Sequence, residues 1–283
     1  MMRTILLPLA PGLSSEPALD VALLLAKRMN SHIRAVFVRP DPALALSYFP
    51  AAMATATTYQ LIESEGRKAE EEEKIRFEAW RSRHGIPAEP ADTRLDTCFA
   101  SWSEQMGEIE PVVIRRGRVS DLIVMQRFAP DNILAQRCFD AALFGSGRPT
   151  LLVPGNPPGD LLDHVLIAWN GSLEASHAVF GALPLLHEAS RVSLFSVPEP
   201  ENDGATGAEL VEALSWQGIP VHQAMIRDKT ATIGAALLAT AADSGASLIV
   251  MGAYTHSRLR QSFLGGVTSH VLANAAIPVV MSH

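Results

Sequence analysis

The chain has 283 residues, of which 48% are apolar, so it can bury a large core and is not predicted to be disordered. Its formal net charge of −7 argues against a general nucleic-acid-binding protein, and its short apolar runs exclude a membrane-spanning helix. The two cysteines match neither a zinc spacing nor a CxxC motif, which favours a reduced, cytoplasmic setting. Residues 5–10 are interpreted as a first strand, because prolines break the run that a signal peptide would need.

The chain repeats itself, and the repeat divides it into two domains. Residues 4–9 resemble 164–169 at an offset of 160, and residues 32–38 resemble 191–197 at an offset of 159. Further along, residues 121–125 resemble 247–251 at an offset of 126, and 149–153 resemble 278–282 at an offset of 129. A Pro- and Gly-rich stretch at 154–159 has the composition of a linker. The predicted domains are therefore 1–154 and 160–283.

The changing offsets locate an insertion in the first copy. The fall from 160 to 126 gives this copy 34 extra residues, which lie within about 40–110. Residues 62–84 within it predict a long helix rich in Glu and Arg, with a solvated charged face. For residues 41–59 three interpretations stay open, namely a lid, an oligomer contact or a packed loop, and packing is favoured.

Strands and helices alternate along the second copy. Strands are predicted at 165–169, 191–197, 221–226, 248–251 and 279–281, and helices at 173–183, 208–217, 232–242 and 267–275. Ser172 is expected to cap the first of these helices, and Gly218 and Gly245 to end the second and third. Short apolar strands joined by helices indicate a doubly wound parallel sheet, whose ligands bind at the carboxyl ends of the strands. Asn170, Val197 and Gly252 fall at such ends.

A glycine-containing loop follows the strand at 248–251. Gly252 is followed by a basic loop that contains Arg258 and Arg260, and then by the paired glycines Gly265 and Gly266 before a helix. Glycines allow close approach to a ligand, and the free N–H groups of a helix N-terminus attract anions, so the loop suits a phosphate. It is not a Walker A loop, and the chain contains neither HExxH nor GxSxG.

On these residues the chain resembles a tandem universal stress protein of the UspA-like family. ATP-binding members carry G-x2-G-x9-G-[ST] after the fourth strand, and here Gly252, Thr255, Gly265 and Gly266 occupy that spacing. Thr255 replaces the second glycine, Gly266 replaces the Ser or Thr, and Asn170 stands where members have an Asp. The resemblance implies two tandem doubly wound domains that are Rossmann-like and of the adenine nucleotide alpha-hydrolase-like class. Each would have a five-stranded parallel sheet flanked by helices.

The resemblance also implies a nucleotide site in the second domain. Its ligand would be ATP, with ADP and AMP as alternatives, and Mg²⁺ can accompany the nucleotide. Adenine would lie near the first two strands, and the phosphates would meet the loop and the helix after it. The implied nucleotide-binding residues are Asn170, Val197, Met251, Gly252, Thr255, Arg258, Gly265, Gly266, Val267 and Thr268.

Each departure from the family pattern has a physical meaning. Asn170 keeps hydrogen-bonding capacity but brings no negative charge. Thr255 is β-branched and disfavours a positive φ, so the turn at this position must differ from the glycine version. Gly266 lacks a hydroxyl but keeps its N–H, and Thr268, one turn on, could supply a hydroxyl instead. A purely structural interpretation also stands, in which the glycines only shape a tight strand–loop–helix junction.

The first copy lacks the features of this loop. Gln126 and Arg127 replace Gly252 and Ala253, and Gln136 and Arg137 align with Gly265 and Gly266. The side chains of Gln136 and Arg137 are expected to occupy the volume that a phosphate needs. We therefore predict that the first domain is structural or regulatory and binds no ATP by this route.

Three functions are compatible with the sequence. The leading hypothesis is a cytoplasmic stress-response regulator that binds an adenine nucleotide in its second domain without catalysing a reaction. The second is a nucleotide-independent scaffold, in which residues 151–153 pair with 279–281 and two chains form a homodimer through residues 41–60. The third is a slow ATPase, for which His256 is the one nearby candidate base. Neither nucleic acid nor a membrane is expected as a partner.

Overall fold

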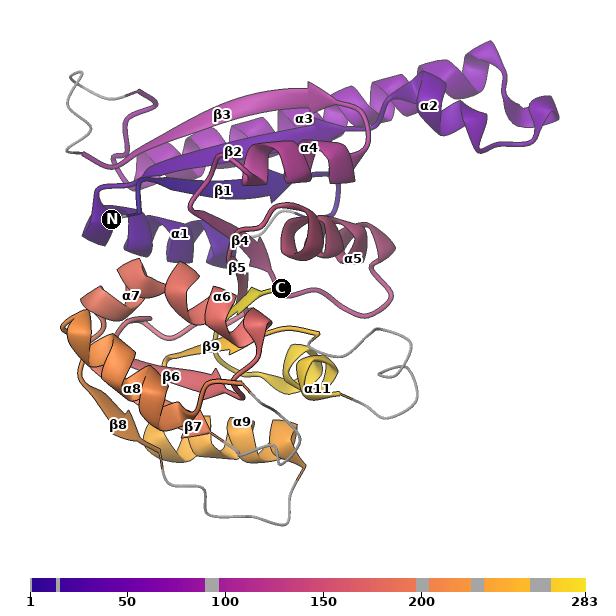
Figure 1. Ribbon diagram of the computed structural model, residues 1–283. Coiled ribbons are helices and arrows are strands. Elements are labelled where there is room, and N and C mark those ends of the chain that lie inside the picture. Colours follow the sequence, from indigo (N-terminus) through magenta and orange to yellow (C-terminus); the bar gives the residue numbers. More distant parts are fainter. Residues whose placement is uncertain (1, 14–15, 90–96, 197–203, 225–231, 255–265) are drawn as a thin grey trace. The chain divides into compact units, whose positions relative to one another are not determined.

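The computed structural model describes residues 2–13, 16–89, 97–196, 204–224, 232–254 and 266–283. The chain forms two compact α/β units, Met1–Arg148 and Pro149–His283 (Figure 1). Within the described ranges, no helix combines the length and the apolar character that crossing a membrane requires.

The first unit contains a four-stranded parallel sheet in the order β3-β2-β1-β4. Ile5 at the centre of this sheet pairs with Ile33 on one side and with Leu122 on the other. In chain order, the elements are β1 (Thr4–Leu9), α1 (Glu16–Met29), β2 (His32–Arg39), α2 (Pro42–Ser47), the 3-10 turn η1 (Ala51–Met53), α3 (Ala56–Arg83), β3 (Phe99–Met106), α4 (Ile109–Gly117), β4 (Leu122–Gln126), α5 (Ile133–Asp140) and the π-turn η2 (Ala141–Gly145).

Helices cover both faces of this sheet, as right-handed crossovers require. On one face α1 and α3 are joined by a hydrogen bond in which Trp80 Nε1 donates to Asp20 Oδ1 over 2.9 Å. On the other face α4 and α5 contact each other. Because both faces are covered, all residues of β1 except Thr4 are buried, which explains its continuous apolar sequence.

The insertion of the first copy forms α2, η1 and the lengthened start of α3. Asp41 caps α2 by accepting hydrogen bonds from the N–H groups of Ala43 and Leu44, and Thr55 caps α3 through Thr58 N. Since Thr55 supplies this cap, α3 starts six residues before the predicted residue 62. The α2 segment and the first turns of α3 extend past the carboxyl ends of β2 and β3 (Figure 1).

The second unit contains six strands in the order β5-β10-β9-β6-β7-β8. Its pairs are parallel except β5–β10, which is antiparallel, with Leu152 opposite Val279 and Leu151 opposite Val280. The predicted pairing of 151–153 with 279–281 is thus confirmed. The elements are β5 (Thr150–Val153), β6 (His164–Trp169), α6 (Leu173–Gly181), α7 (Leu183–Glu188), β7 (Arg191–Ser196), α8 (Gly207–Trp216), β8 (Val221–Gln223), α9 (Ile233–Ser244), β9 (Leu248–Gly252), α11 (Val267–Asn274) and β10 (Val279–Ser282).

The two halves together have the predicted α/β fold, with five strands contributed by each copy of the repeat. Local sequence signals place the helix ends as expected. Ser172 Oγ accepts a hydrogen bond from Ala175 N at the start of α6, and Gly218 and Gly245 follow α8 and α9 with φ values of 76° and 68°. The first strand of each copy is central in its unit, so the ends of these strands mark where a site can form.

Candidate functional site

The topological switch point of the second unit lies between β6 and β9. From β6 the chain continues to β7 on one side of it, and it returns as β9 on the other side. The two strands are parallel, with Ala168 opposite Met251, so their carboxyl ends lie side by side. Asn170 follows β6 and Gly252 ends β9, and these two predicted site residues therefore flank the crevice where doubly wound sheets bind ligands.

Asn170 forms the turn that leads from β6 into α6. Its Oδ1 accepts a hydrogen bond from Ser172 N over 3.2 Å, and Gly171 between them has a φ of 78°. Ser172 in turn caps α6. The side-chain oxygen of Asn170 thus holds the turn that places this residue at the end of β6.

Gly252 is required by the packing of the second unit. A Cβ at this position would lie 2.4 Å from Ala175 N and 2.7 Å from the carbonyl carbon of Glu174. Both neighbours are backbone atoms at the start of α6, so neither can yield. The structural interpretation of this glycine is therefore supported, and it brings the end of β9 directly against the first turn of α6.

The helix α11 begins at the same end of the sheet, and its N-cap residue makes no side-chain hydrogen bond. Gly266 is its N-cap residue, with φ −60° and ψ 160°, and this residue has no side chain with which to cap the first turn. Thr268 is 5% exposed, and its Oγ1 accepts a hydrogen bond from Tyr254 N over 3.2 Å. The predicted hydroxyl donor thus also anchors the chain segment that follows β9.

Tyr254, which lies between the pattern positions Gly252 and Thr255, has a left-handed backbone conformation. Its φ of 59° makes it one of two non-glycine residues with a positive φ in the described part of the chain. A left-handed conformation at a non-glycine residue costs roughly 1 to 3 kcal/mol. The hydrogen bond to Thr268 holds Tyr254 in this conformation.

The described part of the predicted site consists of Asn170, Met251, Gly252, Gly266, Val267 and Thr268. Met251 is 4% exposed with its side chain in the core, so that only its backbone is suited to a ligand. None of the six carries a negative charge. Helix N–H groups and uncharged side chains of this kind fit an anionic group. The other four predicted residues, Val197, Thr255, Arg258 and Gly265, lie outside the described residues, as does His256.

One feature near Asn170 has no signal in the sequence. The buried Trp169 donates a hydrogen bond from Nε1 to Ala205 O over 2.8 Å, and a Cβ on Gly171 would lie 2.7 Å from the same oxygen. Residues 204 and 205, just before α8, thereby lie against the end of β6. The Asn170-Gly171 dipeptide is itself a turn signal, which could have indicated the tight turn but not its partner.

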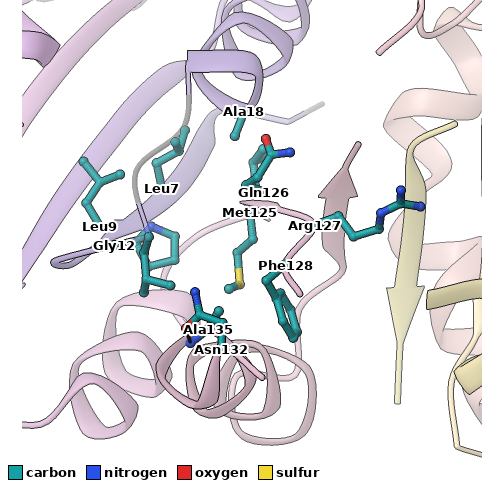
Figure 2. Close-up of a pocket in the computed structure, with 13 residues that line it drawn as sticks. Leu7, Leu9, Gly12, Ala18, Met125, Gln126, Arg127, Phe128, Asn132 and Ala135 are labelled. Atoms are coloured by element: carbon teal, nitrogen blue, oxygen red, sulfur yellow. Dashed lines mark hydrogen bonds between the residues drawn. The ribbon is translucent and has the colours of Figure 1, made fainter. Parts of the chain in front are cut away.

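The equivalent switch point of the first unit is a small, largely apolar cavity. It lies between the ends of β1 and β4 and the start of α5 (Figure 2). Its volume is about 100 Å³. Gln126 and Phe128 line it, and the Arg127 side chain points away from Leu9 and Gly12 (Figure 2). Pockets for ligands of ordinary size are about 300 to 1,000 Å³, so this cavity is too small for a nucleotide.

The helix start at this cavity also differs from that of α11. Asn132 caps α5, its side chain accepting a hydrogen bond from Ala135 N over 3.0 Å. Gln136 Nε2 donates to Asp140 Oδ1 over 3.0 Å, and Arg137 pairs with Glu110. These two side chains were expected to fill the phosphate volume, and the structure shows each of them held by a carboxylate. A cap and nearby carboxylates both disfavour an anion.

Comparison with known proteins gives the fold and the family. Residues 162–283 match the Universal stress protein family. A universal stress protein from Archaeoglobus fulgidus DSM 4304 aligns with a TM-score of 0.67 and 19% identity, covering 99% of this chain and 95% of its own. A putative universal stress protein from Pseudomonas aeruginosa UCBPP-PA14 aligns with a TM-score of 0.50 and 16% identity, covering 99% and 93%. A functionally unknown protein from Pseudomonas aeruginosa PAO1 aligns equally well, with a TM-score of 0.50 and 16% identity over 99% and 92%.

No curated protein matches the chain. These three structural matches are below 25% identity and establish the fold over the full length, whereas the family match rests on the sequence of the second half. The second half of the chain therefore carries the sequence pattern of the universal stress protein family, and the whole chain has the fold of the solved structures that align with it.

Proposed function

We propose that the second unit binds an adenine nucleotide and that the protein acts as a cytoplasmic regulator in a stress response. Members of the family often bind ATP, and ADP or AMP would use the same contacts. Adenine would lie near Asn170 and the backbone around Val197. The phosphates would meet Gly252, Gly265 and the first turn of α11, and Arg258 and Mg²⁺ would balance their charge.

The observation that carries this proposal is the difference between the two helix starts. Asn132 caps α5, whereas α11 begins at Gly266 with no side-chain cap. The first N–H groups of a helix need an acceptor, and a phosphate is a suitable one because the helix dipole also favours negative charge. Only in the second unit is this helix start combined with the family's glycine spacing.

The proposed mechanism is binding without a covalent step. A phosphate on the first turn of α11 would stabilise that turn, and the hydrogen bond from Tyr254 N to Thr268 joins it to the segment after β9. A ligand that orders this segment shifts the equilibrium between its conformations by its differential affinity for them. A partner that recognises the ordered form would then sense the nucleotide.

Replacement of Gly266 tests the phosphate contact. The φ of −60° suits any residue, and Asp at an N-cap position stabilises a helix, so Gly266→Asp should remain folded. Its carboxylate would take the N–H groups that the phosphate needs and would repel the phosphate. Calorimetric titration is expected to show ATP bound at least about tenfold more weakly, which corresponds to about 1.4 kcal/mol.

The matched control is Gly266→Asn, which also caps the helix but adds no charge. It should weaken ATP binding less than the Asp variant does. Equal affinities for ATP in the wild type and Gly266→Asp would show that the phosphates do not lie at this helix start.

A nucleotide-independent scaffold is the second candidate, and two observations favour it. The antiparallel β5–β10 pair joins the last strands of the two copies. The inserted segment also exposes large apolar side chains, namely those of Leu44, Tyr48, Phe49, Met53, Tyr59 and Leu61. We propose that a second copy of the chain covers them in a homodimer. Sedimentation velocity should show a dimer that Phe49→Glu dissociates, and an unchanged mass in that variant would argue against this surface.

A further inference from the structure

The first unit contains a second pocket, which the inserted segment helps to form. It has a volume of about 260 Å³ and lies at the carboxyl ends of β1, β2 and β3, beneath α2. Most of its lining is apolar, with contributions from Ala10, Val38, Leu44, Ala45, Ile109 and Leu134. The lining residues come from the ends of the strands, from α2, from the start of α4 and from α5. The pocket is therefore formed jointly by the sheet and by the helices that surround its carboxyl edge.

Hydrogen bonds are made at both ends of α2, and the one at its C-terminal end ties the helix to the start of α4. At its start, Asp41 Oδ1 accepts a hydrogen bond from Ala43 N over 2.9 Å. At its end, the Tyr48 hydroxyl donates to Glu108 Oε1 over 3.0 Å, and Glu108 is the residue before α4. The helix also contacts α3. The insertion therefore has a defined place in the unit, as the favoured sequence interpretation of a packed segment requires.

The charges at the pocket are mainly negative. Asp41 and Glu108 line it, and the single lining cation, Arg137, is already engaged by Glu110 and lies 3.8 Å from Glu108 Oε1. The hydrogen bond to Glu110 raises the pKa of Arg137, and the hydrogen bond to Glu108 raises the pKa of Tyr48. An anionic ligand would therefore meet two carboxylates and a cation whose charge is already balanced.

We propose that this pocket binds a small, largely apolar molecule that carries no net negative charge. Its volume is slightly below the range of about 300 to 1,000 Å³ that is typical for drug-sized ligands, so a compact molecule is indicated. The apolar walls would provide the affinity by removing apolar surface from water. The carboxylates at the rim would select against acids and accept hydrogen bonds from amino or hydroxyl groups.

This site goes beyond the nucleotide site proposed above, which lies in the other unit and attracts an anion. The first unit would sense a different chemical class, although its pocket occupies the same edge of a doubly wound sheet. The insertion accounts for the difference, because the inserted helix α2 supplies apolar walls to the pocket.

A pair of fluorescent probes tests the charge preference in the full chain. N-phenylnaphthylamine is neutral, and anilinonaphthalenesulfonate has the same aromatic body with an added sulfonate. Fluorescence titration is expected to show the neutral probe bound at least about tenfold more tightly. Saturating ATP should not displace it. Tighter binding of the sulfonated probe, or displacement of the neutral probe by ATP, would overturn the proposal.

Two substitutions on α2 test the location. Ala45 lines the pocket and Ala43 is exposed on the same helix, so Ala45→Trp fills the cavity whereas Ala43→Trp adds the same side chain outside it. The first should weaken binding of the neutral probe at least about tenfold and the second less than about twofold. Equal effects of the two substitutions would show that the probe binds the exposed apolar surface instead.

A third variant changes the charge without filling the pocket. Glu108→Gln keeps an acceptor for Tyr48 and removes one carboxylate, so it should fold as the wild type does. Binding of the sulfonated probe should strengthen, and binding of the neutral probe should stay within about twofold. If neither probe responds, the carboxylate does not face the bound molecule and the proposed selectivity is wrong.

Discussion

At the scale of single residues, the two described glycines of the loop pattern, Gly252 and Gly266, have different physical explanations. Gly252 is fixed by contact with the backbone of α6, whereas Gly266 has an ordinary backbone conformation that other residues could adopt. Packing explains the first glycine without a ligand, and it does not explain the second. Gly266 is therefore the more informative position for binding, although both fit the same sequence spacing.

The contact at Gly252 makes a direct prediction for stability. Gly252→Ala forces a Cβ to within 2.4 Å of Ala175 N, and relief requires movement of β9 or α6. Overpacking of this kind typically costs about 1 to 3 kcal/mol. Denaturant unfolding should show this loss. Gly155→Ala serves as the control, because a Cβ there meets nothing within 4 Å; a loss as small as in this control would mean that the close approach does not exist.

The sequence correctly predicted the residues that start or end a helix through local contacts. Ser172, Gly218 and Gly245 act through their own turn of helix, so their functions could be predicted from position alone. The hydrogen bond of Trp169 to Ala205 could not be predicted, because it joins residues 36 apart in the sequence and depends on where Ala205 packs. The left-handed Tyr254 was missed for a similar reason, since a tertiary hydrogen bond to Thr268 holds it.

At the scale of elements, the repeat predicted the strands well because buried parallel strands have apolar sequences that are easily aligned. Segments without a counterpart in the other copy were harder to predict. Residues 42–61 form α2, η1 and the start of α3, and their apolar side chains are partly exposed, so they lack the periodicity of a buried face. The pocket beneath α2 could not be predicted, because it depends on where this helix packs.

The β2–β3 pair predicts a pH dependence of stability. His32 stacks on Phe99 with ring centroids 3.9 Å apart, and burial, followed by the charge of Arg34, lowers its pKa from 6.5 to about 4. The folded state therefore binds fewer protons than the unfolded state between these values, and its stability is lost as pH falls through them. Stability is complete above about pH 6.5, where the imidazole is neutral in both states.

Replacement of this histidine tests the dependence. His32→Phe keeps an aromatic ring against Phe99 but cannot be protonated. Urea unfolding at pH 7 and pH 5 should show a smaller loss of stability in the variant than in the wild type. His164, whose pKa is also lowered by burial, acts in the same direction but is present in both proteins. An equal loss in the two proteins would mean that His32 is not responsible.

At the scale of the whole molecule, two copies of one fold have diverged in what their strand ends can bind. The second unit combines an uncapped helix start with the family's glycine spacing. The first has a capped helix, a small cavity and a separate pocket covered by its insertion. The two proposed sites would let the two halves respond to different molecules, and the central claim is that only one half binds a nucleotide.

The stoichiometry of ATP binding to the full chain, measured by calorimetry, tests that claim most directly. One nucleotide per chain is expected, with binding weakened by Gly266→Asp and unaffected by Ala45→Trp in the first unit. Two nucleotides per chain, or none, would contradict the account.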